Sequence, residues 1–174
     1  MCRNMSPKMR LLLALIILCS CIGCDQVTKS IATRTLHCGP PTSLLADTIR
    51  FDFALNPGGF LSLGSNLPDY LRNWIFVSLN SIVMLGLFAF LCLKRNIPVA
   101  LFISLVFMLA GGIGNLIDRI WNNGLVTDFI IVGIGPLRTG VFNVADMAVL
   151  FGAIAVVCLS YRRDEIGQAT PKCR

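Results

Sequence analysis

The sequence predicts a membrane protein with an all-α core of four transmembrane helices, a small extracytoplasmic β-rich cradle, and both termini in the cytoplasm. Hydrophobic residues make up 55% of the chain and charged residues only 14%, whereas soluble domains are about 25% charged. The uncharged residues gather in four long runs, and many of the basic residues cluster at one end of these runs. This composition disfavours a secreted globular protein, a disordered chain and a nucleic-acid module, and predicts a single 174-residue membrane domain.

The two middle helices are expected over residues 71–93 and 98–118. No residue is charged from Asn73 to Leu93, or from Asn96 to Ile117. A helix needs about 20 apolar residues to cross the hydrocarbon core of a bilayer. Each run is long enough to span the membrane by itself.

The two outer helices, expected over 10–30 and 140–160, each contain an acid. The run from Leu11 to Cys24 is followed by Asp25, and the last run contains Asp146. These helices reach spanning length only if both acids lie inside or at the edge of the bilayer. An ionisable residue at that depth costs roughly 2.5–3.5 kcal/mol, so it tends to face a cavity and to serve function.

The distribution of basic residues predicts the orientation, because cytoplasmic loops carry an excess of lysine and arginine. One side of the predicted topology carries Arg3, Lys8, Arg10, Lys94, Arg95, Arg162, Arg163, Lys172 and Arg174. Six other cations are spread over the much longer segments of the opposite side. Both termini are therefore expected in the cytoplasm, and the net charge of +6 indicates contact with anionic membrane lipids rather than a nucleic-acid partner.

Two extracytoplasmic segments are expected to form the cradle, over 33–70, and a further loop, over 119–139. Residues 48–55 alternate apolar and polar side chains, which is typical of a half-buried strand. A turn signal, Asn56-Pro57-Gly58-Gly59, follows at once. In the second segment a short apolar stretch, 129–134, lies between glycines.

Polar side chains share single faces of three predicted helices, near their extracytoplasmic ends. Spacings of three or four residues place side chains on one helical face. The set comprises Asp25 and Lys29 on the first helix, Asn115, Asp118 and Arg119 on the third, and Asn143 and Asp146 on the fourth. Four small residues of the third helix allow close approach of a neighbouring helix: Ala110, Gly111, Gly112 and Gly114. We therefore expect the polar groups to converge on one layer.

Among the chemistries that this layer could support, carboxylate catalysis fits best. His37 is the only histidine and there is no HExxH motif, so we expect neither a metal site nor a cofactor. A Ser–Lys pair that uses Lys29 is possible, but no serine lies in a telling context. Asp118, Asp128 and Asp146 remain as candidates. Two close carboxyl groups can share one proton and activate a water for attack on a peptide carbonyl.

Four stretches resemble one known family, the bacterial lipoprotein signal peptidases, also called signal peptidase II. They are DQVTK (Asp25–Lys29), GGIGNLIDR (Gly111–Arg119), VTDFI (Val126–Ile130) and FNVAD (Phe142–Asp146). The resemblance implies a four-helix aspartic endopeptidase of the bacterial cytoplasmic (inner) membrane with a β-cradle outside. It implies cleavage of lipidated prolipoproteins just before the diacylglyceryl-cysteine, without a cofactor, and by motif position the catalytic pair Asp128 and Asp146. We expect a monomer.

The resemblance also implies supporting roles for other polar residues. Asn115, Asp118, Arg119 and Asn143 would hold the acid pair and contact the substrate backbone or the inhibitor globomycin. Asp25 and Lys29 would brace the first helix against the cradle.

One loop departs from the family pattern. Members usually read Asn-x-Gly-Ala-Ala-Phe-Ser, where this chain has NPGGFLS (Asn56–Ser62). Asn56 and Gly58 keep their places, but the aromatic residue arrives one position early. Because this loop would border the substrate entrance, the departure is compatible with a paralogue of narrower specificity.

The residues taken alone leave other interpretations open. A small four-helix protein with paired acids could be a proton-coupled transporter, an accessory subunit or a structural anchor, and Asp118 could serve only as an ion pair that pins the third helix. The first apolar run also resembles a lipoprotein signal peptide that is cut before Cys21. The intact helix is favoured, because it gives Asp25 and Lys29 a use.

Overall fold

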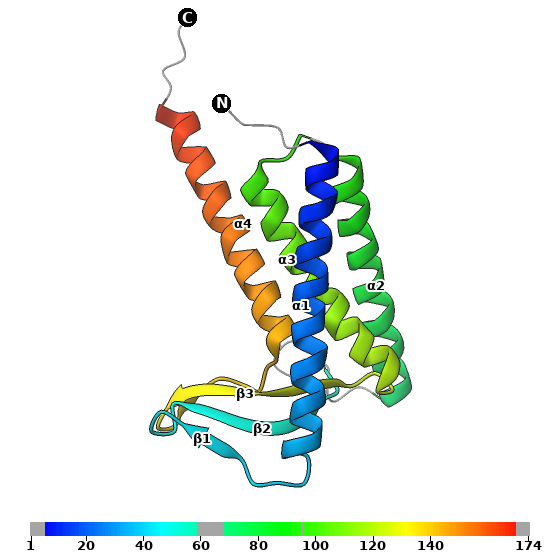
Figure 1. Ribbon diagram of the computed structural model, residues 1–174, viewed down its shortest axis with the longest axis vertical. Helices are drawn as coiled ribbons and strands as arrows, with labels where there is room; N and C mark the ends of the chain where they lie inside the picture. The colour runs from blue at the N-terminus through cyan, green and yellow to red at the C-terminus, as the bar shows by residue number, and fades with distance from the viewer. Residues whose placement is uncertain (1–5, 59–67, 95, 170–174) are drawn as a thin grey trace, which may run out of the picture.

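The computed structural model describes residues 6–58, 68–94 and 96–169. Four helices lie side by side, with a small sheet at one end of the bundle (Figure 1). Their bounds are α1 Pro7–Leu36, α2 Asp69–Leu93, α3 Val99–Trp121 and α4 Val144–Ala169. All four are long and apolar enough to cross a membrane, which confirms the predicted helical core.

Some sequence predictions fall outside the described residues. These are the basic residues Arg3, Arg95, Lys172 and Arg174, and the loop residues 59–62. In the described part, α1 begins and α4 ends at the end of the bundle opposite the sheet (Figure 1). The orientation of this arrangement in the membrane stays a prediction.

Helix α1 is longer than the sequence indicates. It begins after Ser6, whose hydroxyl accepts a hydrogen bond from the backbone N–H of Met9 at 3.3 Å, with Pro7 in the first turn. It continues to Leu36 rather than ending at 30, so residues 33–36, expected in the cradle, are helical. The thickness of the bilayer limits the apolar run, but it does not limit a helix that extends beyond the membrane.

Helix α3 lies at the centre of the bundle and packs against α1, α2 and α4. Its buried residues include the small residues Ala110, Gly111, Gly112 and Gly114. A methyl group at Gly111 would collide with the carbonyl oxygen of Ala145 in α4. The close helix approach predicted from these small residues is therefore present.

Helix α4 begins at Val144 rather than at 140, because Asn143 caps it. The Asn143 Oδ1 accepts from the Asp146 backbone N–H at 2.9 Å, and the Asp146 Oδ2 accepts from the Asn143 backbone N–H at 3.2 Å. This reciprocal pair has the geometry of a capping box. Asp146 therefore stands in the first turn of α4, at the edge of the bundle nearest the sheet.

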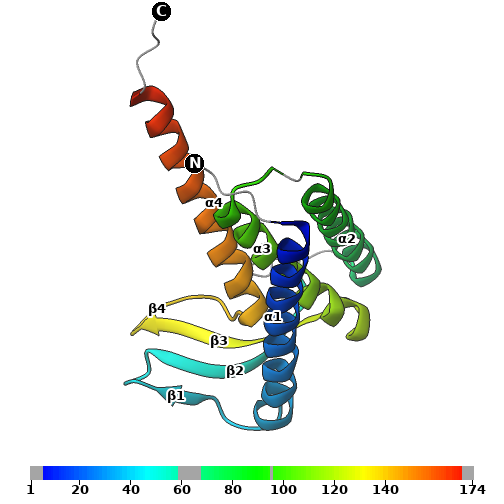
Figure 2. The ribbon, with the colours of Figure 1, turned by 45° about the horizontal axis from the view of Figure 1, so that its top comes forward.

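The sheet has four antiparallel strands in the order β1-β2-β3-β4, and Figure 2 shows it at the end of the helices. The strands are β1 Thr42–Leu44, β2 Ile49–Asn56, β3 Val126–Ile134 and β4 Leu137–Arg138. The strand expected over 48–55 is β2. A shift in register between Phe51 and Ala54 places Ala54 opposite Asp128 and Asn56 opposite Val126. Asn56 and Asp128 are therefore diagonal neighbours on one face of the sheet.

Candidate active site

Asp128 of β3 and Asp146 of α4 are joined by a single residue, Asn143. The Asn143 Nδ2 donates to Oδ1 of Asp128 at 2.6 Å, while its backbone N–H donates to Oδ2 of Asp146 at 3.2 Å. Asn143 has no exposed surface and Asp128 is 2% exposed. The sheet and the helix bundle thus contribute one acid each to a buried cluster.

The second oxygen of Asp128 also has a donor. The Nδ2 of Asn56 lies 2.9 Å from the Asp128 Oδ2, as the β2–β3 register allows. The pKa of Asp128 is raised to about 6, mainly because the group is buried and also because of the nearby charge of Asp146, while the hydrogen bonds from Asn56 and Asn143 oppose the rise. A carboxyl group with such a pKa can hold or release a proton near neutral pH.

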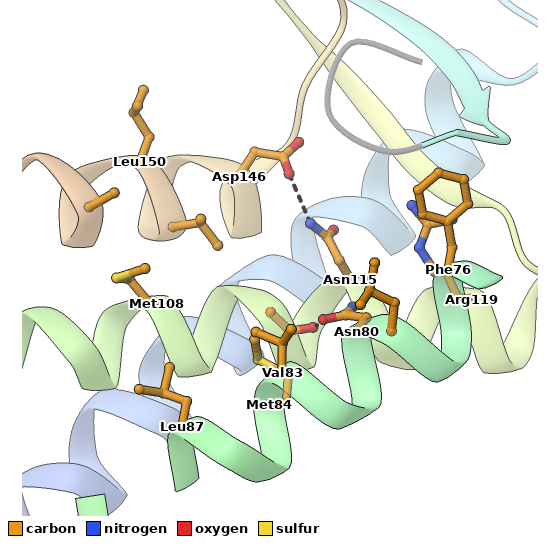
Figure 3. Close-up of a pocket in the computed structure, with 14 residues that line it drawn as sticks. Phe76, Asn80, Val83, Met84, Leu87, Met108, Asn115, Arg119, Asp146 and Leu150 are labelled. Carbon is orange, nitrogen blue, oxygen red and sulfur yellow. Dashed lines mark hydrogen bonds between the residues drawn. The ribbon is translucent and has the colours of Figure 1, made fainter. Parts of the chain in front are cut away.

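Asn115 of α3 connects this pair to the first helix. Its Nδ2 donates to the Asp146 Oδ1 at 2.8 Å (Figure 3). Its Oδ1 accepts from the Asn143 Nδ2 at 3.0 Å and from the Lys29 Nζ at 3.1 Å. Each carboxylate oxygen of the two acids therefore accepts one hydrogen bond from an asparagine.

Lys29 belongs to a buried ion cluster with two further acids. Its ammonium lies 2.8 Å from Oδ2 of Asp25 and 3.2 Å from Oδ2 of Asp118. The Asp25 Oδ1 accepts from the backbone N–H of Ala145 at 2.9 Å. The bracing predicted for Asp25 and Lys29 is thus directed to α3 and α4 rather than to the cradle, because α1 crosses the bundle where these helices meet.

Asp118 positions the start of β3. Its Oδ2 accepts from the backbone N–H of Thr127 at 2.8 Å, one residue before Asp128. Its Oδ1 accepts from Gln26, which also donates to Asp25 and to the carbonyl oxygen of Gly114. Sequence reasoning did not single out Gln26, although it lies within the DQVTK motif. Asp118 therefore acts here as an anchor between helices and sheet.

Arg119 contacts two backbone carbonyl oxygens and an aromatic ring. Its guanidinium donates to the carbonyl oxygens of Gly58 at 2.5 Å and of Gly124 at 2.8 Å, and lies 5.1 Å from the centre of the Phe76 ring. Gly58 lies in the loop that departs from the family pattern, at a position that keeps the family residue. Arg119 thereby fixes both the end of β2 and the turn before β3.

A groove of about 530 Å³ between α2, α3 and α4 leads to Asp146. Its wall is mostly apolar. Its polar residues are Asn80, Asn115, Arg119 and Asp146, of which the last three lie at the end nearer the sheet (Figure 3). The apolar lining includes Val83, Met84, Leu87, Met108, Val149 and Leu150. The groove can accept a long apolar group whose polar end reaches Asp146.

Asn56 and the six supporting residues expected from the sequence lie in or around this cluster. In the described part of the chain, no group of three or more His, Cys, Asp or Glu side chains is arranged to hold a metal ion. The site therefore offers paired carboxyl groups, amide donors and buried cations as its chemistry.

Comparison with known proteins identifies relatives over most of the chain. The family described as signal peptidase (SPase) II matches residues 16–162. A lipoprotein signal peptidase of Mycolicibacterium smegmatis is 32% identical over 173 residues, which cover 95% of this chain and 69% of the relative. One of Borrelia duttonii is 35% identical over 153 residues, which cover 85% of this chain and 89% of the relative.

Two solved structures share the fold. One, a bacterial membrane enzyme determined by the in meso method at 2.3 Å resolution, has a TM-score of 0.76 at 22% identity, with 100% of this chain and 99% of that chain covered. A second, at 1.9 Å resolution, has a TM-score of 0.71 at 24% identity, with 91% and 96% covered. The four helices and the sheet are therefore a known membrane-enzyme architecture.

Proposed function

The chain belongs to the signal peptidase II family, a family of aspartic peptidases, and we propose that it removes signal peptides from lipid-modified prolipoproteins with Asp128 and Asp146 as its catalytic pair. It is a multi-pass protein of the bacterial cytoplasmic membrane. The assignment of the two acids rests on their motif positions and on their geometry.

The observation that carries the assignment is the link through Asn143. Two acids from different elements, β3 and α4, accept hydrogen bonds from one buried asparagine. One of the two, Asp146, lies at the polar end of an apolar groove. Two neighbouring carboxyl groups cannot both ionise cheaply, so one keeps a proton that the pair can share. Such a pair can act as base and acid in one reaction.

Hydrolysis then proceeds without a covalent intermediate. The ionised carboxylate takes a proton from a water molecule, whose oxygen attacks the scissile carbonyl carbon. The protonated partner gives its proton to the leaving nitrogen as the C–N bond breaks. Because the two groups titrate as a unit, base and acid roles belong to the pair and not to one named residue.

The groove suits a substrate that arrives through the lipid. Its lining comes from α2, α3 and α4, and the apolar side chains in it match acyl chains or the apolar part of a signal peptide. Cleavage before the diacylglyceryl-cysteine would put the scissile bond at the polar end, beside Asp146. The loop after β2 would border the entrance, and Asn56 and Arg119 would hold that loop in place.

The membrane placement and assembly follow the same proposal. With the sheet outside and both termini in the cytoplasm, the acid pair would lie where lipid meets water. The described network is built from one chain, with α1, α3, α4, β2 and β3 all contributing. A monomer would therefore suffice for activity, and its mass in detergent can be measured by light scattering.

A gel-shift cleavage assay in detergent tests this function. The substrate is a diacylglyceryl-modified prolipoprotein, with the unmodified precursor as a second substrate. We expect the wild type and Asp52→Asn, a change in β2, to cleave the lipidated form only. Asp128→Asn and Asp146→Asn should be folded but inactive, and cleavage by either variant at the wild-type rate would refute the assignment.

A further inference from the structure

The side chain of Lys29 reaches the catalytic pair through one intermediate residue. We propose that Lys29 is a positioning residue for hydrolysis, whose ammonium holds the Asn115 amide in the orientation that donates to Asp146. This inference rests on the proposed roles of Asp128 and Asp146. It differs from a bracing role, in which Lys29 would only hold α1 in the bundle.

The three hydrogen-bond donors of the Lys29 ammonium are all used. They face Oδ2 of Asp25 at 2.8 Å, Oδ2 of Asp118 at 3.2 Å and Oδ1 of Asn115 at 3.1 Å. An ammonium carries three N–H bonds and accepts none, so three contacts of this kind fix the direction of the group. Only 4% of Lys29 is exposed, so water does not compete for these contacts.

The orientation of the Asn115 amide decides whether Asp146 faces a hydrogen-bond donor or an acceptor. An amide presents an acceptor oxygen on one side and two donors on the other. The Asn115 Oδ1 faces two donors, Lys29 Nζ and Asn143 Nδ2, so its Nδ2 must face Oδ1 of Asp146, at 2.8 Å. A reversed amide would set donors against donors and an oxygen against a carboxylate.

Lys29 also acts on the acid pair through its positive charge. Its positive charge lowers the pKa of Asp128 against the effect of burial. Two further carboxylates, Asp25 and Asp118, hold that charge in place. The cluster therefore places a fixed cation one asparagine away from the acids.

A double-mutant cycle separates positioning from bracing. The variants are Lys29→Met, Asn115→Ala and the combination, with Lys94→Met at the opposite end of the bundle as the matched control. Rates are measured with purified protein and a diacylglyceryl-modified prolipoprotein. We expect Lys29→Met to lower kcat about 100-fold, the order of loss that misplacement of a reacting group causes. KM and the activity of Lys94→Met should stay close to the wild type.

The cycle gives the decisive outcome. If Lys29 acts through Asn115, adding Lys29→Met to Asn115→Ala should lower kcat by roughly 2-fold or less. A change of this size is no larger than the error with which the effects of independent mutations add. The same large loss in both backgrounds, or an effect on KM alone, would overturn the positioning role and leave bracing.

A second background keeps the test valid if Lys29→Met does not fold. Asp118→Asn combined with Lys29→Met removes one negative and one positive charge, so the net charge of the buried cluster is kept. The effect of Lys29→Met is then measured in the Asp118→Asn background, once with Asn115 intact and once with Asn115→Ala. A positioning role again predicts that Lys29→Met lowers kcat only where Asn115 is intact. If Asp128→Asn or Asp146→Asn were active, the proposed function would fail; if they are inactive and the cycle shows no coupling, only this inference fails.

Discussion

Asn143 and Asp146 cap each other at the start of α4, through contacts of 2.9 Å and 3.2 Å. The same asparagine places its Nδ2 2.6 Å from the Oδ1 of Asp128. The residue that starts the helix therefore also sets the distance between the two acids. The side-chain cap and the contact to Asp128 are separable, because the Asn143 Oδ1 caps the helix while its Nδ2 donates to Asp128.

Substitution of Asn143 should separate these two roles. Serine caps a helix about as well as asparagine, whereas alanine costs about 1 kcal/mol. We therefore expect Asn143→Ser to be more stable than Asn143→Ala in thermal unfolding. Both variants lose the donor to Asp128, so both should lose activity on the order of 100-fold. Wild-type activity in the serine variant would mean that Asn143 serves only as a cap.

The raised pKa of Asp128 predicts a pH-dependent stability. In the unfolded chain this carboxyl has a pKa of 3.8, and burial raises it to about 6 in the folded protein. Between these values the folded state keeps a proton that the unfolded state has lost, so the stability from Asp128 is full below about pH 4 and is lost as pH rises through 6.

Thermal unfolding of wild type and Asp128→Asn from pH 4 to pH 7 measures this contribution. As pH rises, the free energy of unfolding of Asp128→Asn should increase relative to that of the wild type, by on the order of 2 kcal/mol. A constant difference across this window would contradict a buried, perturbed carboxyl at Asp128.

The contact between α3 and α4 predicts the effect of a single methyl group. Gly111→Ala would drive its Cβ into the Ala145 carbonyl, whereas Gly86 in α2 has nothing within 4 Å of the corresponding position. We expect Gly111→Ala to destabilise by about 1–3 kcal/mol. Gly86→Ala should stabilise by about 0.4–1 kcal/mol. Apparent melting temperatures in detergent test the pair, and equal values would argue against the tight α3–α4 contact.

Arg119 predicts a difference between arginine and lysine. Its guanidinium donates to two carbonyl oxygens, those of Gly58 and Gly124, and a lysine cannot reproduce this planar fork. Loss of one such bond costs about 1.5–3 kcal/mol, so Arg119→Lys should lower stability and raise KM for the prolipoprotein. Arg34→Lys, on an exposed part of α1, is the control. An unchanged KM would separate Arg119 from the substrate entrance.

The helical core could be predicted from the sequence because a membrane strongly restricts the structure of an apolar segment. Uncharged runs such as Asn73–Leu93 must be helices where no water satisfies the backbone. The ends of α1 and α4 could not be predicted, because they depend on local contacts. Leu36 lies beyond the membrane limit, and the start at Val144 is set by the cap of Asn143.

The residues of the candidate site could be predicted from the sequence, but the contacts between them could not. Spacing placed Asp25, Lys29 and Asn115 on the correct faces. It could not show that Lys29 points to α3, or that Arg119 contacts carbonyl oxygens, since such partners come from distant segments. Asp128 had no helical periodicity to mark it, so its candidacy came from the motif resemblance.

Single-turnover cleavage by Asp128→Asn, Asp146→Asn and the double variant tests the central claim most directly. If the two acids share one proton and act as a unit, each single variant should lose activity on the order of 1,000-fold or more, and the double variant should be no slower than the slower single variant. Losses that multiply in the double variant, or near-normal cleavage by either single variant, would contradict a shared catalytic pair.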